Sequence, residues 1–320
     1  MLKNLVKNLE PSSTLRINEI SKNLEKEGKN IFKFGFGQSP FPVPKNLINE
    51  LKNNAHQNKY LPMQGLEELR ISVAKYISIK KKYNYSSANV IVGPGSKELM
   101  FLLHVAFEGE IILPIPSWVS YAPQAIIGRN KIQMLETKRE NDWFPTGSEI
   151  EKIILKDKDK NYLLFLNSPN NPSGQICENL SEISEVAKKY NLIILSDEIY
   201  SEINFDNEYK SISNFCPEKT IISNGLSKWC GAGGWRLGYF IIPDNLKIIK
   251  KIKIQIRKNA SPRHVPSKII VVNDIPRTKS GKIVELAVKN TIEGNEIKNK
   301  EALVNPEILE DYKNIKELEY

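Results

Sequence analysis

The sequence predicts an α/β domain in which a largely parallel β-sheet is covered by helices. Seven short apolar runs are continuous rather than alternating, which indicates strands buried on both faces. Helical patterns lie between several of these runs, an order that is typical of a parallel sheet. The 320 residues, 40% of them hydrophobic and 26% charged, are enough for one large domain or two smaller ones.

The elements follow from these patterns in chain order. The strand-like runs cover residues 89–92, 110–113, 131–135, 162–166, 192–195, 220–223 and 237–242. The helical patterns cover residues 13–27, 66–82, 96–107 and 180–190. After residue 257 the character changes: prolines end a helical run, and strand-like pieces at 268–272 and 283–285 flank a polar turn. We therefore expect a small α+β fragment at the C-terminal end.

Composition excludes several classes of protein. No apolar run approaches the roughly 20 residues of a membrane helix, and the first residues lack the apolar core of a signal peptide. Three cysteines without a CxxC motif predict no disulfide framework and a reducing, cytoplasmic location. The three histidines lie far apart in the sequence, so we expect no metal site.

The net charge of +9 raises the question of a nucleic-acid partner. The densest basic cluster spans residues 247–258, where isoleucines recur at helical spacing between the lysines. No aromatic residues are interleaved with them, so a solvated helix face is favoured over a nucleic-acid surface.

The candidate ligand-binding residues lie in loops that follow the predicted strands, as in other open α/β sheets. Residues 93–97, Gly-Pro-Gly-Ser-Lys, can present free amides of a helix start to an anion. Taken alone, this segment is more often an ordinary strand-to-helix turn, and the P-loop spacing is absent. Trp118, after the next strand, could stack on a planar ring or fill the core.

Two later loops carry ionisable groups. Asp197 ends a buried strand, where its charge is costly unless it meets a positive partner such as a protonated ring nitrogen. Lys228 lies in a glycine-rich turn with Arg236 eight residues later, so an amine and a guanidinium can face one anionic ligand. A neutral lysine amine can form Schiff bases.

Four motifs in this order carry a family resemblance: N-N-P-S-G at 170–174, S-D-E-I-Y at 196–200, S-N-G-L-S-K at 223–228 and G-W-R-L-G-Y at 234–239. Residues 34–249 resemble the class I/II aminotransferases of fold type I, which depend on pyridoxal 5′-phosphate. The resemblance implies a large domain with a mainly parallel seven-stranded sheet and flanking helices. It also implies an amino acid and a 2-oxo acid as substrates.

The resemblance implies a role for each matching residue. Lys228 would carry the cofactor and act as general base and acid, and Asp197 would pair with the pyridinium nitrogen. Tyr200 and Asn171 would hydrogen-bond the ring hydroxyl oxygen, and Trp118 would stack on the ring. The phosphate would be held by Gly95, Ser96, Lys97 (through its backbone) and Arg236.

Two further positions extend the implied site. Tyr60 resembles the tyrosine that reaches the phosphate of the neighbouring subunit, which implies a homodimer with shared sites. Gly37 resembles the glycine beside the substrate carboxylate.

The resemblance stops near residue 252, so no segment resembles the small C-terminal domain or its carboxylate-binding arginine. Residues 255–320 instead resemble the C-terminal lid of adenylate-forming acyl-CoA ligases, and acetoacetyl-CoA synthetase most closely. There Lys282 would be the lysine that reaches the acyl-adenylate. Because no nucleotide-binding body accompanies it, an exposed turn lysine is the favoured interpretation. This divides the chain into an N-terminal helical segment (1–30), a cofactor-binding large domain (31–252) and a lid-like fragment (255–320).

These observations predict an aminotransferase whose cofactor side is complete and whose substrate side lacks its arginine, so we expect cofactor binding with weak or no turnover. One alternative is a non-catalytic module for pyridoxal-phosphate binding or dimerisation. Another is a ligase lid fragment, brought here by a join of two unrelated genes, that acts on a separate adenylating body.

Overall fold

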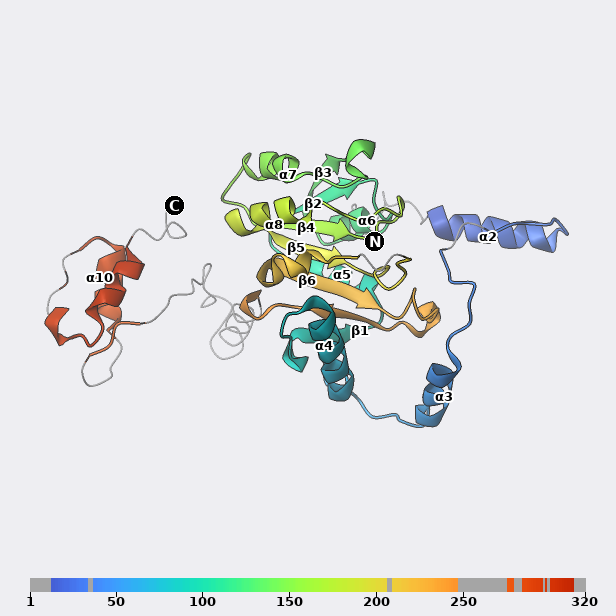
Figure 1. Cartoon of the computed structure of the whole chain (residues 1–320), viewed down its shortest axis with the longest axis horizontal. Helices are drawn as coiled ribbons and strands as arrows, with labels where there is room; N and C mark the ends of the chain where they lie inside the picture. The colour runs from blue at the N-terminus through green and yellow to red at the C-terminus, as the bar shows by residue number, and fades with distance from the viewer. Residues whose placement is uncertain are drawn as a thin grey trace, which may run out of the picture. The chain divides into compact units, whose positions relative to one another are not determined.

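The computed structural model describes residues 13–33, 37–205, 209–246, 275–278, 284–295, 297 and 300–313 (Figure 1). The chain forms two compact units, Met1–Lys247 and Ile248–Tyr320. The first unit holds the large sheet and its helices. The predicted helical run at 247–258, the predicted strand at 268–272 and Lys282 lie outside the described residues.

The first unit is built on one seven-stranded sheet with the order β1-β7-β6-β5-β4-β2-β3. Its strands are β1 (Val90–Gly93), β2 (Glu110–Ile115), β3 (Lys131–Glu136), β4 (Tyr162–Asn167), β5 (Ile193–Asp197), β6 (Thr220–Gly225) and β7 (Gly238–Ile241). Only β7 runs antiparallel to its neighbours. All seven predicted strands are confirmed, with ends that differ by at most two residues.

The helices of this unit flank the sheet or precede it in the chain. They are α2 (Ser13–Lys26), α3 (Lys45–Asn54), α4 (Glu67–Lys81), α5 (Ser96–Ala106), α6 (Tyr121–Ile127), α7 (Gly147–Ile154) and α8 (Leu180–Lys189). The predictions of α2, α4, α5 and α8 are confirmed, whereas α3, α6 and α7 were not predicted. Helix α3 buries no residue and α6 is only seven residues long, whereas α7 buries Ile150, Ile153 and Ile154 at helical spacing and could have been predicted.

Both faces of the sheet are covered, which explains the continuous apolar runs. All six residues of β4 are buried. Leu164 and Leu166 pack in one cluster with residues of α7 and α8, which lie side by side (Figure 1). Leu163 and Phe165 point the other way, into a cluster with residues of α5 and α6. Because successive side chains of a strand alternate between faces, only an apolar run satisfies both clusters.

The second unit has a small core of its own. Helix α10 (Glu285–Ile292) contributes Ala287, which packs with Leu303 and Leu309. The strand predicted at 283–285 is wrong at Glu285, which begins α10. An isolated antiparallel bridge joins Leu303 to Thr278 instead.

Three properties of the described residues bear on the composition arguments. None of their helices combines the length and apolarity that crossing a bilayer requires. The cysteines Cys177, Cys216 and Cys230 are buried and free. Within these ranges, no three histidine, cysteine, aspartate or glutamate side chains gather as metal ligands would.

Candidate active site

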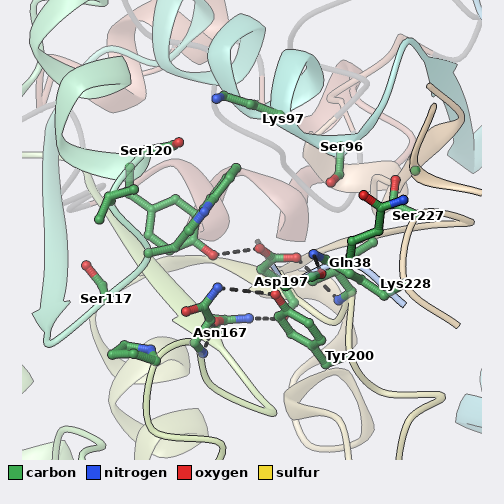
Figure 2. Close-up of a pocket in the computed structure, with 18 of the residues that line it drawn as sticks. Gln38, Ser96, Lys97, Ser117, Ser120, Asn167, Asp197, Tyr200, Ser227 and Lys228 are labelled. Atoms are coloured by element: carbon green, nitrogen blue, oxygen red, sulfur yellow. Dashed lines mark hydrogen bonds between the residues drawn. The ribbon is translucent and has the colours of Figure 1, made fainter. Parts of the chain in front are cut away.

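A pocket of about 800 Å³ opens where β2, β4, β5 and β6 end, the edge at which parallel strands place ligands (Figure 2). Its lining includes nine of the residues that sequence analysis singled out: Gly37, Ser96, Lys97, Trp118, Asn171, Asp197, Tyr200, Lys228 and Arg236. These residues are spread over two hundred positions of the chain, and the sheet brings them together.

Asp197 is the last residue of β5 and is 4% exposed. Its Oδ2 accepts a hydrogen bond of 2.6 Å from the hydroxyl of Tyr121, and its Oδ1 accepts one of 3.3 Å from the amide of Ile199. Burial raises the pKa of Asp197 to about 6. No described lysine, arginine or histidine lies within ion-pair distance of this carboxylate. A cationic ring nitrogen would supply the missing positive partner, so the site fits one.

Lys228 follows β6 and lines the same pocket (Figure 2). Its Nζ donates a 2.8 Å hydrogen bond to the carbonyl oxygen of Gly37, 191 residues earlier in the chain. The same Nζ lies 5.4 Å from the centre of the Tyr200 ring. A ligand in this pocket can therefore meet a lysine amine and a buried carboxylate at once.

An anion cradle lies at the start of α5. Gly95 is the N-cap residue with φ of +90°, and the first amides of a helix have no acceptor within it. The Arg236 guanidinium is packed against this turn, since a Cβ on Gly95 would lie 2.2 Å from its Nη2. It donates hydrogen bonds to the carbonyl oxygens of Pro94 and Gly233. Free amides beside a fixed guanidinium fit a phosphate group.

The remaining walls of the pocket are hydrogen-bonded to one another. Asn171 donates to the Tyr200 hydroxyl over 3.2 Å. Asn167 accepts from the amide of Asn171 over 2.7 Å and donates to the carbonyl of Asp197 over 2.9 Å. The half-buried Trp118 ring packs edge-on against Tyr121. These contacts fix two polar groups on one side of the cavity and an aromatic face on another.

Three predicted residues are not among the described residues that line the pocket: Gly95, which belongs to the anion cradle, Tyr60 and Lys282. Tyr60 is fully exposed and does not line the pocket, and Lys282 is outside the described residues. Sequence reasoning in turn gave no role to Tyr121, Asn167, Gln38 and Ser227, which do line it. Asn167 could have been found, because it ends a predicted strand at the ligand-binding edge. Tyr121 carried no such signal, since its partner is far away in sequence.

Comparison with known proteins agrees with this geometry. The family model described as aminotransferase class I and II matches residues 29–274, so it continues beyond residue 252, where the sequence resemblance was expected to end. The aspartate aminotransferase of Bacillus sp. (strain YM-2) is 32% identical over 250 residues, which are 75% of this chain and 63% of that protein. The aspartate aminotransferase of Sulfolobus acidocaldarius is 34% identical over 258 residues, which are 75% of this chain and 62% of that protein.

Among solved structures, the aspartate aminotransferase of Thermus thermophilus with maleate superposes with a TM-score of 0.73 at 26% identity. The match covers 82% of this chain and 69% of that one. The chain thus spans less than two thirds of the length of the first curated relatives it matches. The sheet with its flanking helices is that of fold type I transferases, whose class I and II members depend on pyridoxal 5′-phosphate. By sequence and by fold, this chain belongs to the class I and II aminotransferases.

Proposed function

We propose that this chain binds pyridoxal 5′-phosphate and transfers an amino group between an amino acid and a 2-oxo acid. The observation that carries the proposal is that Asp197 and Lys228 line one pocket whose rim holds an anion cradle. A buried carboxylate, a lysine amine and a phosphate site in one cavity match the three polar ends of this cofactor.

Each residue of the pocket has its own role in this reaction. When bound, pyridoxal 5′-phosphate supplies an electron sink for the substrate carbon. Asp197 keeps the ring nitrogen protonated, and Lys228 holds the cofactor and moves a proton to and from the substrate carbon. Asn171 and Tyr200 orient the ring through its hydroxyl oxygen, and Trp118 packs on its face. The phosphate is held by Gly95, Ser96, Lys97 and Arg236.

We further propose a substrate with a second carboxylate. Several relatives are named aspartate aminotransferases. In this chain Lys97 lines the pocket, and its Nζ lies 5.4 Å from the centre of the Trp118 ring. Arg236 is the only arginine among the described lining residues, and it belongs to the phosphate cradle. Without a second arginine for the α-carboxylate at Gly37, turnover should be weak.

Cofactor attachment is the direct test. Incubation with pyridoxal 5′-phosphate followed by borohydride should add the mass of the reduced cofactor to the peptide that contains Lys228. The Lys228→Ala variant should take up none, whereas Lys219→Ala, at a lysine bonded to Asn191 outside the pocket, should label fully. Absence of Lys228-dependent labelling would reject the proposal.

Release of a 2-oxo acid then distinguishes an active aminotransferase from a module that only binds the cofactor. L-aspartate added to the loaded protein should yield a 2-oxo acid faster than L-alanine does. Labelling of Lys228 with no 2-oxo acid from any amino acid would indicate a non-catalytic binding module.

We also propose a homodimer in which Tyr60 serves the partner's site. Tyr60, Leu61 and Met63 are 105%, 59% and 98% exposed on one short segment, an unusual cost for apolar side chains unless another surface covers them. Light scattering should give twice the chain mass, and Tyr60→Phe should weaken cofactor binding. A monomer at micromolar concentration would refute the shared site.

For the second unit we propose a relationship to the ligase lid in which Lys282 is a turn lysine with no adenylate-binding body to act on. The support is the P-R-T-K-S-G-K sequence at 276–282, followed by a helix in a separately packed unit. Mixing the chain with an adenylating body that lacks its lid should leave thioester formation unrestored, whereas restoration that Lys282→Ala abolishes would support the alternative of a working lid. The free, buried cysteines fit a reducing compartment, and we propose the cytoplasm.

A further inference from the structure

We propose that Tyr121 is a positioning residue of this site, whose hydroxyl keeps the Asp197 carboxylate ionised and directed at the cofactor ring nitrogen. The inference rests on the function proposed above. It concerns a side chain to which the sequence motifs assign no role.

The contact is short and specific. Tyr121 begins α6, and its hydroxyl donates to Asp197 Oδ2 over 2.6 Å, across 76 residues of sequence. Figure 2 draws this bond as a dashed line that ends on a carboxylate oxygen of Asp197. A hydrogen bond to a carboxylate is shorter and stronger than one between neutral groups, and 2.6 Å is in that range.

The tyrosine ring has no freedom to turn away. It is 2% exposed and lies between two other rings: Trp118 at 5.4 Å, edge-on, and Phe165 at 5.1 Å. Burial, together with the neighbouring Asp197 charge, raises the pKa of the Tyr121 hydroxyl well above its ordinary value. The hydroxyl therefore remains protonated near neutral pH and can donate to the carboxylate.

The other groups that act on Asp197 are few. Burial raises the pKa of Asp197 to about 6, and the charge of Glu198, the residue that follows the strand, acts in the same direction. The Tyr121 hydroxyl opposes burial most strongly, ahead of the Ile199 amide and the Lys228 charge. From β4, Asn167 contacts only the backbone carbonyl. Tyr121 is thus the principal side chain that stabilises the ionised carboxylate before the cofactor arrives.

Loss of the Tyr121 hydroxyl should weaken cofactor binding most at low pH. A protonated Asp197 cannot pair with a protonated ring nitrogen, so cofactor affinity falls as pH drops through the pKa of Asp197. Without the tyrosine hydroxyl that pKa rises, by about one to two units if a hydrogen bond to a charged group is lost. Affinity should then fall at a higher pH in the variant than in the natural protein.

The test compares the dissociation constant for pyridoxal 5′-phosphate in the full chain and in Tyr121→Phe by equilibrium dialysis between pH 6 and pH 9. The ratio of variant to natural constants should be about 1 at pH 9, about two- to tenfold at pH 7 and larger at pH 6. The ratio cancels the titration of the cofactor phosphate and of Lys228, which both proteins share.

Tyr162→Phe is the matched control. Tyr162 is also buried, but its hydroxyl bonds to the carbonyl of Asp157, and it does not line the pocket. Its ratio should stay near 1 at every pH. A pH-independent ratio for Tyr121→Phe, or one equal to that of the control, would overturn the inference while leaving cofactor binding intact. Failure of the natural protein to bind at all would overturn the proposed function and this inference with it.

A second variant keeps the inference testable if Tyr121→Phe does not fold. 3-Fluorotyrosine at position 121 retains the shape of the ring and has a more acidic hydroxyl, which is a stronger donor. Its ratio should fall below 1 at pH 6 and return to 1 at pH 9. An unchanged or increased ratio at pH 6 would refute the role of the hydrogen bond.

Discussion

Two adjacent lysines at the end of α4 make a direct test of buried against exposed ion pairs. Lys81 Nζ lies 2.7 Å from Glu198 Oε2, and the two side chains are 6% and 0% exposed. Ser196 and Ser211 donate to the other carboxylate oxygen. Lys80 pairs with Glu202 instead, where the side chains are 43% and 17% exposed.

The stability lost when either lysine is replaced depends on how deeply its ion pair is buried. At 2.7 Å and an effective dielectric constant of about 20, the Lys81–Glu198 attraction is on the order of 6 kcal/mol before desolvation is subtracted. Lys81→Met removes that attraction and leaves Glu198 buried without a cation, so we expect a loss of about 3–5 kcal/mol in the free energy of unfolding. Lys80→Met should cost about 0–1 kcal/mol, because water and salt screen the exposed pair.

Urea unfolding followed by tryptophan fluorescence measures this difference in the correct unit, because all four tryptophans lie in Met1–Lys247. The double variant Lys81→Met/Glu198→Gln should recover much of the loss, since it removes the unpaired charge. Equal losses for Lys80→Met and Lys81→Met would refute the argument that burial decides the cost.

Two other predictions follow from buried groups. Burial lowers the pKa of His104, which is 0% exposed, to about 4, so the unfolded chain binds more protons between pH 4 and 6.5. Stability should therefore fall by about 2 kcal/mol from pH 7 to pH 5 on this account, and His104→Gln should remove that slope in urea titrations, whereas His56→Gln should not. At Gly238, a Cβ would lie 2.1 Å from the Ser96 amide nitrogen and 2.5 Å from the Gly95 carbonyl carbon. Gly238→Ala should displace the start of α5 and cost about 3 kcal/mol or more in thermal unfolding, whereas Gly234→Ala, with nothing within 4 Å, should cost less than about 1 kcal/mol.

Local patterns predicted the elements that bury a continuous or periodic apolar surface. Strands β4 and β6 were evident because every residue of each is buried. Helix α7 was missed although Thr146 and Glu149 form a capping box that marks its start. Helix α3 offered no such signal, because it packs no residue into the core.

The residues of the site also fall into those that local sequence predicts and those that it does not. Asp197 and Lys228 could be predicted because each ends or follows a buried strand, and a charge there needs a partner. The roles of Tyr121 and Lys81 could not, because each depends on a contact far away in sequence with the Asp197–Glu198 segment. A tyrosine near a helix start and a lysine at a helix end look ordinary until that contact is known.

The sequence alone thus determined the order of strands and helices and the loops that carry polar chemistry, because hydrophobic periodicity and strand ends are local properties of the chain. Only the tertiary structure decided which loops share a pocket, since strand order places β5 between β4 and β6 and so sets Asp197 between Asn167 and Lys228. It also decided the state of Asp197, because the burial and the hydroxyl that together set its charge come from different elements of the fold.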